Sequence, residues 1–123
     1  MKQEFILYEQ ALSLKELDFN ETCLGYCNSF FKNDIIKEGI NGCVNSALES
    51  NEVTLPLYQQ AFRWFREKYN LHTTIHPDKW CEISKDGLVV KDTCSYKTYK
   101  EAEIECLKKL IEIVKGDFNH NGD

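Results

Sequence analysis

The stretch LPLYQQAFRWFREKYNLH (55–72) combines aromatic rings with amide and guanidinium groups that could bind a ligand. On a helical wheel, Gln59, Arg63 and Arg66 fall within about 60° of one another. Two guanidinium groups and an amide can hold a planar anion through paired hydrogen bonds. The same side chains can also form a solvated face, in which Arg63 pairs with Glu67 one turn along the helix. The sequence leaves both alternatives open.

The aromatic side chains of this stretch fall mainly on the opposite side of the wheel. Phe62 and Phe65 lie within the apolar arc, and we expect them to be core residues. Tyr58 and Trp64 fall at the two margins of the arc, where amphipathic aromatic residues suit a pocket rim or a subunit interface. The predicted ligand-binding residues are therefore Gln59, Arg63, Arg66, Trp64 and Tyr58.

The sequence contains no recognisable catalytic motif. It has no Gly-rich phosphate loop, no nucleophile elbow and no His-Glu-x-x-His. A cysteine and a histidine could still meet in space, but no spacing favours one pair over another. His72 and His76, four apart on a predicted strand, would lie about 13 Å apart, too far to share a metal ion. We therefore predict a protein that is not an enzyme and has no catalytic residue, metal site or cofactor.

The last seven residues, DFNHNGD (117–123), resemble the opening of a calcium-binding loop. They supply oxygen-bearing side chains at the first, third and fifth positions and a glycine at the sixth. The sequence stops before the glutamate that closes such a site at the twelfth position. We interpret this segment as a flexible polar tail.

Composition restricts the classes of partner. The chain has 15 Lys and Arg against 20 Asp and Glu, a net charge of −5, which argues against nucleic acid because phosphate binding needs a positive face. No apolar run approaches the roughly 20 residues of a membrane span, and the N-terminal apolar run is too short for a signal peptide. We expect a cytoplasmic protein without membrane contact, whose six cysteines are reduced thiols.

The pattern of apolar residues and turn signals predicts an α+β domain. Helices are expected at 4–17, at 56–69 with Pro56 in the first turn, and from a Thr98–Glu101 capping box to Gly116. Short strands are expected at 22–28, 71–76, 80–84 and 88–94, together with a hairpin through Asn41-Gly42. The predicted fold is an antiparallel sheet packed by about three helices, with the second half in the order α-β-β-β-α. Residues 1–116 would form one domain.

The order α-β-β-β-α is also that of double-stranded-RNA-binding domains. Such domains need lysines at the start of their last helix to grip phosphates. Here the predicted helix begins with Lys100 followed by Glu101 and Glu103, which weaken the positive end. An RNA-binding domain is therefore a lesser alternative.

The chain resembles a family of small proteins encoded by gut Bacteroides-type genomes, their phages and mobile elements. The family's helix motif, Ala-Pro-Thr-Leu-Gln-x-Ala-x-Lys-Trp-Leu-Arg-Glu, is similar to LPLYQQAFRWFRE here, which keeps Pro56, Gln59, Ala61, Trp64, Arg66 and Glu67. The segments 8–27 and 96–114 are similar to the family's entry and closing elements. Leu55 and Leu57 replace the motif's Ala and Thr, and Asp18 replaces a Gly. The lost Thr removes a polar group at the helix entrance, and the family supplies no catalytic residues.

The resemblance implies a small accessory protein of a phage or mobile element that acts in the cytoplasm of a bacterial host. Our leading hypothesis is a non-enzymatic, homo-oligomeric binder of a host ligand. One version is an anti-defence protein that sequesters a nucleotide immune signal, with the arginines and Gln59 on phosphate or base and Trp64 or Tyr58 stacking. The alternative is a protein–protein adapter that inhibits a host enzyme through an acidic face.

Overall fold

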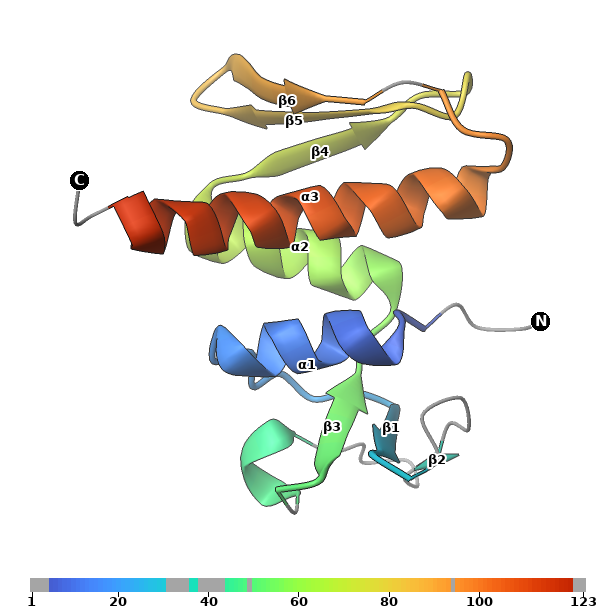
Figure 1. The fold of residues 1–123 in the computed structure, drawn as a ribbon, viewed down its shortest axis with the longest axis vertical. Coiled ribbons are helices and arrows are strands. Elements are labelled where there is room, and N and C mark those ends of the chain that lie inside the picture. The colour runs from blue at the N-terminus through green and yellow to red at the C-terminus, as the bar shows by residue number, and fades with distance from the viewer. Residues whose placement is uncertain (1–4, 31–35, 38–43, 49, 94, 121–123) are drawn as a thin grey trace. The chain divides into compact units, whose positions relative to one another are not determined.

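The computed structural model describes residues 5–30, 36–37, 44–48, 50–93 and 95–120, with backbone alone at 36–37 and 117–120. Contacts gather in two compact units, residues 1–57 and residues 58–123, which are described separately below (Figure 1). Three α-helices and two antiparallel sheets confirm the predicted α+β class. The expectation that 1–116 folds as one domain stays a prediction. None of the described helices has the length and apolar character needed to cross a membrane.

The first unit is a three-stranded antiparallel sheet with one α-helix packed against it. Strand β1 lies in the middle of the sheet, between β2 and β3, and helix α1 packs on β3. The elements are α1 (Tyr8–Glu16), β1 (Gly25–Asn28), β2 (Ile36–Lys37), the 3-10 turn η1 (Asn45–Ala47) and β3 (Glu52–Leu55). The core contains buried side chains from α1, β1 and β3, among them Leu14, Cys27 and Val53.

The sequence interpretation of the first unit was wrong in several boundaries. The first helix begins at Tyr8 instead of residue 4, because Phe5 is extended and forms a β-bridge with Leu57. The first strand begins at Gly25 instead of residue 22. Leu24, which lies within the predicted strand, precedes the observed one and is exposed. The predicted hairpin turn at Asn41-Gly42 lies outside the described residues.

The end of α1 has a regular hydrogen-bonded cap. Asp18 adopts a left-handed backbone conformation with φ of 69°, and its amide donates to the carbonyl of Lys15 at 3.0 Å. The amide of Phe19 donates to the carbonyl of Leu14 at 3.0 Å. These two bonds form a Schellman motif, in which glycine is the usual left-handed residue. Asp18 therefore ends the helix, as predicted, while holding a position that favours glycine.

The second unit has the predicted order α-β-β-β-α. Its elements are α2 (Tyr58–Tyr69), β4 (His72–Ile75), β5 (Cys81–Lys85), β6 (Leu88–Asp92) and α3 (Tyr99–His120). The strands pair in the order β4-β5-β6, all antiparallel. Helix α3 packs on β4 and β5, and α2 packs on β4 and on α3, so both helices cover the same face of the sheet (Figure 1). Strand β6 lies at the edge of the sheet farthest from β4.

Local sequence signals account for the second sheet. Asp86 and Gly87 both have positive φ, 54° and 82°, as a two-residue type I′ turn between β5 and β6 requires. Along β5, Cys81 and Ile83 are buried while Glu82 and Ser84 are half-buried, which is the alternation of a strand with one covered face. The strands predicted at 80–84 and 88–94 are thus confirmed as the two arms of a hairpin.

Two predicted helix boundaries in this region differ from the structure. Helix α2 begins at Tyr58, so Pro56 is not in its first turn. Pro56 follows directly on β3, a strand that the sequence interpretation missed, and its carbonyl accepts a bond from the amide of Ile6 at 3.0 Å. Helix α3 continues past Gly116 to His120, because Gly116 does not take the left-handed conformation that would end it. The predicted Thr98 cap is present, with the Glu101 amide donating to Thr98 Oγ1 at 3.0 Å.

Candidate functional site

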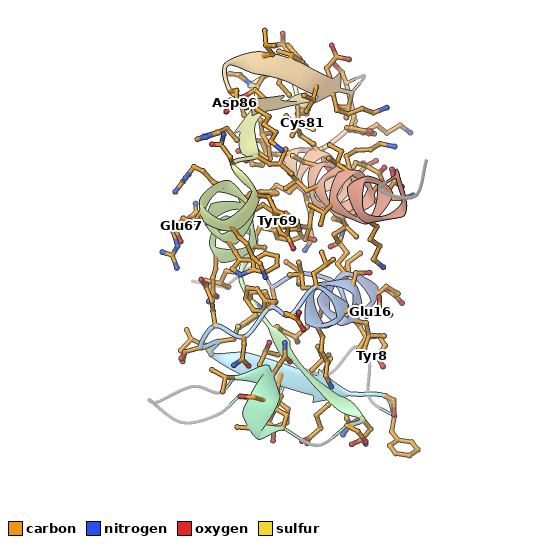
Figure 2. All side chains as sticks on the ribbon, turned by 90° about the vertical axis from the view of Figure 1, so that its left-hand side faces the viewer. Tyr8, Glu16, Glu67, Tyr69, Cys81 and Asp86 are labelled. Carbon is orange, nitrogen blue, oxygen red and sulfur yellow. The ribbon has the colours of Figure 1, made fainter. Side chains whose placement is uncertain are left out.

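Three of the five predicted ligand-binding residues form one exposed row on α2, which we call the α2 stripe: Gln59, Arg63 and Arg66. All three are exposed, which confirms that they lie on the polar side of the helix. Glu67 projects outward from the same helix, while Tyr69 points towards α3 (Figure 2). Arg66 and Lys68 lie in the last turn, where cations interact favourably with the helix dipole. That placement is favourable without any ligand, so ligand contact by the α2 stripe stays a prediction.

The two aromatic residues assigned to the same site lie elsewhere. Tyr58 is 1% exposed and Trp64 is 6% exposed. The indole of Trp64 packs edge-on against Phe65, with ring centroids 5.1 Å apart, and against Tyr69 at 5.6 Å. The ammonium of Lys68 lies 5.0 Å from the centre of the Trp64 ring. A ligand on the α2 stripe would therefore meet guanidinium and amide groups, but not these two rings as they now lie.

Of the two phenylalanines expected in the core, Phe65 is fully buried, as predicted. Phe62 is only half-buried, and its ring lies 6.2 Å from that of Tyr58. The buried side of α2 is thus centred slightly differently from the prediction. Trp64 is more buried than expected, and Phe62 is less buried.

A hydrogen-bonded cluster follows the end of α2. Asn70, with φ of 58°, donates from Nδ2 to Asp86 Oδ1 at 2.7 Å. Its Oδ1 lies 3.0 Å from Nε2 of His72. Asn70 thereby joins the end of α2 to β4 and to the turn between β5 and β6 (Asp86 is labelled in Figure 2). Sequence analysis missed this cluster, whose only local signal is an Asn directly after a helix.

A second polar cluster lies at the turn between β4 and β5. The ring of His76 stacks on the indole of Trp80, with centroids 3.9 Å apart and planes inclined by 14°. His76 Nε2 lies 2.6 Å from Glu82 Oε1, and the His76 amide donates to the carbonyl of Trp80 at 2.8 Å. These contacts fix the turn and leave His76 and Glu82 about one-third exposed. Within the part of the chain that the structure describes, neither His76 nor His72 belongs to a group of three or more side chains that could hold a metal ion.

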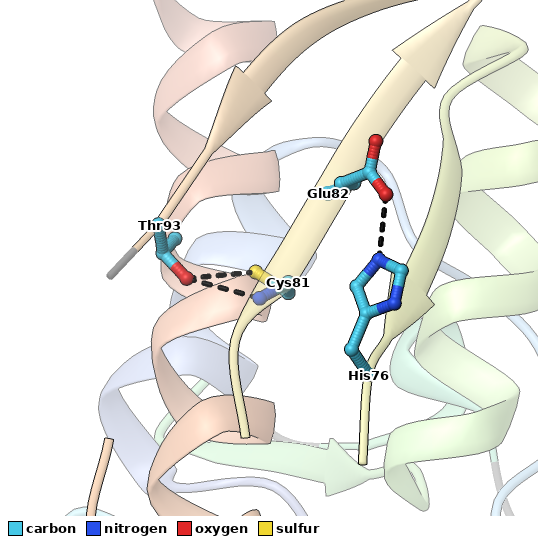
Figure 3. A network of polar contacts seen from close by, with 4 residues as sticks. All are labelled: His76, Cys81, Glu82 and Thr93. Atoms are coloured by element: carbon cyan, nitrogen blue, oxygen red, sulfur yellow. Dashed lines mark hydrogen bonds and ion pairs between the residues drawn. The ribbon is translucent and has the colours of Figure 1, made fainter. Parts of the chain in front are cut away.

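The sheet separates His76 and Glu82 from the thiol of Cys81. Cys81 and Glu82 are consecutive on β5, so their side chains project from opposite faces of the sheet (Figure 3). Cys81 faces the helices. Thr93 Oγ1 lies 3.7 Å from its sulfur and accepts a bond from its backbone amide at 3.0 Å. A nucleophilic pair of Cys81 with His76 is therefore ruled out by strand geometry.

Cys81 on β5 and Cys106 on α3 are both fully buried, and these two elements pack against each other. The bond from Cys106, helped by the bond from Thr93, lowers the pKa of Cys81 to about 7, although burial opposes the change. The same thiol–thiol bond and burial raise the pKa of Cys106 above its ordinary value. In the first unit, burial and then the Glu9 carboxylate raise the pKa of Cys27 to about 11.

The strand β6 exposes an apolar surface that sequence analysis did not single out. Leu88 is 71% exposed, Val89 is 54% exposed and Val90 is 49% exposed. The remaining two residues of the strand, Lys91 and Asp92, are exposed as well. Three consecutive exposed apolar residues on an edge strand are a typical feature of a surface that pairs with another chain.

The first unit contains an open hollow of about 420 Å³. It is lined by Lys15, Asp18, Phe19, Asn20, Asn45 and Ser46. Several of these polar groups already have partners inside the unit. Lys15 Nζ donates to the carbonyl of Glu52 at 2.9 Å, and the amide of Ser46 donates to Asn20 Oδ1 at 2.8 Å. The polar side chains that line the hollow therefore bond mainly to other groups of the first unit, which leaves few of them for a ligand.

Among the described residues, no group of three or more His, Cys, Asp and Glu side chains is placed to hold a metal ion. Searches against protein-family models, curated proteins and solved structures gave no match for this chain. The resemblance to proteins of Bacteroides-type genomes and their phages therefore stays a prediction.

Proposed function

We propose that this chain is a non-catalytic binding protein that docks another protein along β6. The observation that carries the proposal is the exposed apolar row Leu88, Val89 and Val90 on an edge strand. Apolar side chains in this position are costly to leave in water, and natural proteins usually protect such edges. A partner chain that covers them would remove that cost.

The backbone geometry of β6 indicates how a partner would bind. The two-residue turn makes Lys85 and Leu88 the hydrogen-bonded pair that closes the hairpin, because such pairs flank a type I′ turn. The next pair, Ser84 and Val89, is then a non-hydrogen-bonded pair, and the amide and carbonyl of Val89 point to the open edge. An extended segment with apolar side chains could therefore add to the sheet as a fourth strand.

The bulge in this hairpin limits the length of that segment. The register between β5 and β6 shifts at Ile83 and Ser84, which leaves Val90 as the extra residue. Bulges bend an edge strand and end regular pairing, and they are a common protection against uncontrolled strand addition. The proposed partner segment is therefore short and centred on Val89.

The decisive variant is Val89→Pro. Proline removes the outward amide that a partner strand needs, yet it breaks no bond to β5, and edge strands tolerate proline at such positions. A partner identified by native mass spectrometry of protein purified from its own host would be made separately and mixed with each variant. We expect Val89→Pro to abolish the complex with unchanged circular dichroism. The matched control is Leu12→Ser, at another exposed leucine, which should bind normally.

Hydrogen exchange provides the second measurement. A partner strand on β6 would slow the exchange of the Val89 amide in the complex and leave the exposed face of α2 unchanged. If Val89→Pro binds as well as the wild type, or if protection falls outside β6, the proposal is wrong.

The second candidate is the capture of an anionic ligand, such as a nucleotide immune signal, by the α2 stripe. It is supported by the exposure of Gln59, Arg63 and Arg66 on one side of a single helix. The resemblance described above, which implies an anti-defence protein of a phage or mobile element, also supports this candidate. Because Trp64 and Tyr58 are buried, recognition would rely on bidentate bonds from the arginines to phosphate.

Calorimetry with cyclic and linear nucleotides tests this second candidate. Arg66→Ala should weaken binding by tenfold or more, since charge-assisted bonds contribute about 1.5–3 kcal/mol each. Lys85→Ala, which removes an exposed cation from β5, is the matched control and should leave binding unchanged. Equal losses in the two variants, or no binding of any nucleotide to the wild type, would exclude the α2 stripe as a ligand site. A shift of duplex RNA in a gel would instead favour the RNA alternative.

A further inference from the structure

The open edge of β6 is complementary to itself (Figure 1). Val89 turns its amide and carbonyl to that edge, because it forms a non-hydrogen-bonded pair with Ser84 on β5. Its two neighbours, Leu88 and Val90, are also exposed apolar residues. The apolar row therefore has the residue with the outward backbone groups at its centre. A row with this symmetry matches a second copy of itself that runs in the opposite direction.

We propose that β6 pairs antiparallel with β6 of a second copy of this chain, about a twofold axis that passes between the two Val89 residues. This inference rests on the proposed function, docking along β6, and names the partner. The Val89 amide of each copy donates to the Val89 carbonyl of the other, which gives two hydrogen bonds related by the axis. The two three-stranded sheets then join into one continuous sheet.

This register also covers the whole apolar row. With Val89 opposite Val89, Leu88 of each copy lies opposite Val90 of the other. Side chains that lie directly opposite each other on antiparallel strands are in contact, and pairs of aliphatic side chains stabilise the sheet. Every apolar side chain of the two rows therefore meets another apolar side chain, and none is left against a charge.

A shifted register matches the same surface less well. Asp92 also turns its backbone groups to the open edge, because it pairs with Glu82 and the next residue, Thr93, donates to β5. A register that joins Val89 of one copy to Asp92 of the other would therefore satisfy the backbone. It would also place an apolar side chain opposite a carboxylate. Backbone hydrogen bonding and apolar contact together favour the pairing centred on Val89.

The charges beside the row are compatible with a second copy. Lys91 and Asp92 follow the row, Lys85 and Asp86 lie at the turn before it, and all four are exposed. Antiparallel pairing brings the first of these ends beside the second end of the other copy. Each end carries one cation and one anion, so the pairing brings no block of like charge together.

The interface is small, so we expect a weak and reversible dimer. A typical stable complex buries about 800 Å² on each partner, and three side chains with one strand edge cover only a fraction of that area. The bulge at Val90 bends the strand and keeps the paired segment short. Dilution should therefore separate the two copies.

Sedimentation equilibrium of the purified full-length chain tests for the dimer. Concentrations from about 10 μM to about 1 mM span the affinities expected of a small interface. The average mass should rise from one chain towards two in the wild type and in the matched control Leu12→Ser, at another exposed leucine. Val89→Pro removes the outward amide and should keep the mass of one chain at every concentration, with unchanged circular dichroism.

Isotope-filtered NMR reads the register without any variant. In an equal mixture of labelled and unlabelled wild type, contacts between copies should join the methyl groups of Leu88 to those of Val90, and Val89 to Val89. Dilution should remove these contacts. A dimer that lacks them refutes the proposal, even if Val89→Pro fails to fold.

The outcomes separate this inference from the proposed function. A wild type that stays monomeric at the highest concentration refutes the self-pairing, and so does a dimer that folded Val89→Pro leaves intact. Docking along β6 would still stand in either case if a host partner binds the wild type and does not bind Val89→Pro. A dimer with the contacts centred on Val89 supports the self-pairing even where no host protein binds at β6.

Discussion

Asn45 and Thr54 are joined by a buried hydrogen bond, in which the Thr54 amide donates to Asn45 Oδ1 at 2.9 Å. The other half of the Asn45 amide, Nδ2, donates to the carbonyl of Phe19 at 2.8 Å. Asn45 thereby ties the segment after α1 to β3. Asn45→Ala leaves a buried amide and a buried carbonyl without partners, and each such group costs about 1–3 kcal/mol. We expect the free energy of unfolding to fall by about 2–4 kcal/mol, as measured by urea denaturation followed by circular dichroism.

Asn20→Ala is the matched control for this prediction. Asn20 also bonds the 3-10 turn, to Ser46, but both residues are exposed and water can replace the lost bonds. Its substitution should cost less than about 1 kcal/mol. Equal losses of unfolding free energy in the two variants would show that the burial of Asn45 does not account for its effect on stability.

Asp18→Gly should stabilise the protein. Asp18 has φ of 69° at the end of α1, a conformation that costs a residue with a Cβ atom roughly 1 kcal/mol relative to glycine. The gain is partly offset by the greater freedom of glycine in the unfolded chain, so we expect a net increase of about 0.5 kcal/mol. Asp78→Gly, at an exposed turn position without positive φ, should not stabilise, and a melting temperature raised equally by both variants would contradict the explanation.

The pH dependence of stability should show opposite slopes on either side of pH 9. The bond from Cys106 lowers the pKa of Cys81 to about 7 from an ordinary 9.0, so between these values the unfolded chain binds a proton that the folded chain has released. The free energy of unfolding therefore rises from pH 7 to pH 9, by an amount on the order of 2 kcal/mol. Above pH 9 the direction reverses, because the folded chain keeps two protons that the unfolded chain loses. The Cys81 thiol and burial raise the pKa of Cys106, and burial and Glu9 raise the pKa of Cys27 to about 11.

Urea denaturation at intervals of half a pH unit measures both slopes. Cys81→Ala should remove the rise between pH 7 and pH 9, and Cys27→Ala should reduce the fall above pH 9. A wild-type stability that is flat from pH 7 to pH 9, or unchanged in slope by Cys81→Ala, would show that the Cys81 thiol does not ionise in the folded chain.

The second unit was predictable from sequence because its signals are local. The Asp86-Gly87 turn sets the β5–β6 hairpin, and the Thr98 cap starts α3 within one residue of the predicted position. The first unit depends on contacts between distant residues. Asn45 lies 26 positions from its partner Phe19, and β3 pairs with β1 across an intervening segment of low periodicity. No local sequence pattern predicts such contacts, which explains why β3 was not predicted.

The candidate site was predictable only in part for the same reason. Helical periodicity is enough to place Gln59, Arg63 and Arg66 on an exposed side of α2. Helical periodicity does not determine whether a residue at the margin of the apolar arc is buried or exposed. Trp64 is drawn inward by its edge-on contacts with Phe65 and Tyr69, which depend on side-chain packing. The burial of Cys106 likewise depends on the position of α3 on the sheet, which no spacing in the sequence specifies.

Substitutions along α2 should separate binding residues from structural ones. Arg66→Ala and Gln59→Ala alter exposed side chains, so each should change the free energy of unfolding by less than about 0.5 kcal/mol. Trp64→Ala should cost about 3–5 kcal/mol, because it empties a buried space and removes edge-on contacts with two rings. Urea denaturation followed by circular dichroism measures all three. A large loss in Arg66→Ala would give the α2 stripe a structural role and remove the case for a ligand, whereas a small one leaves its exposed guanidinium available for binding.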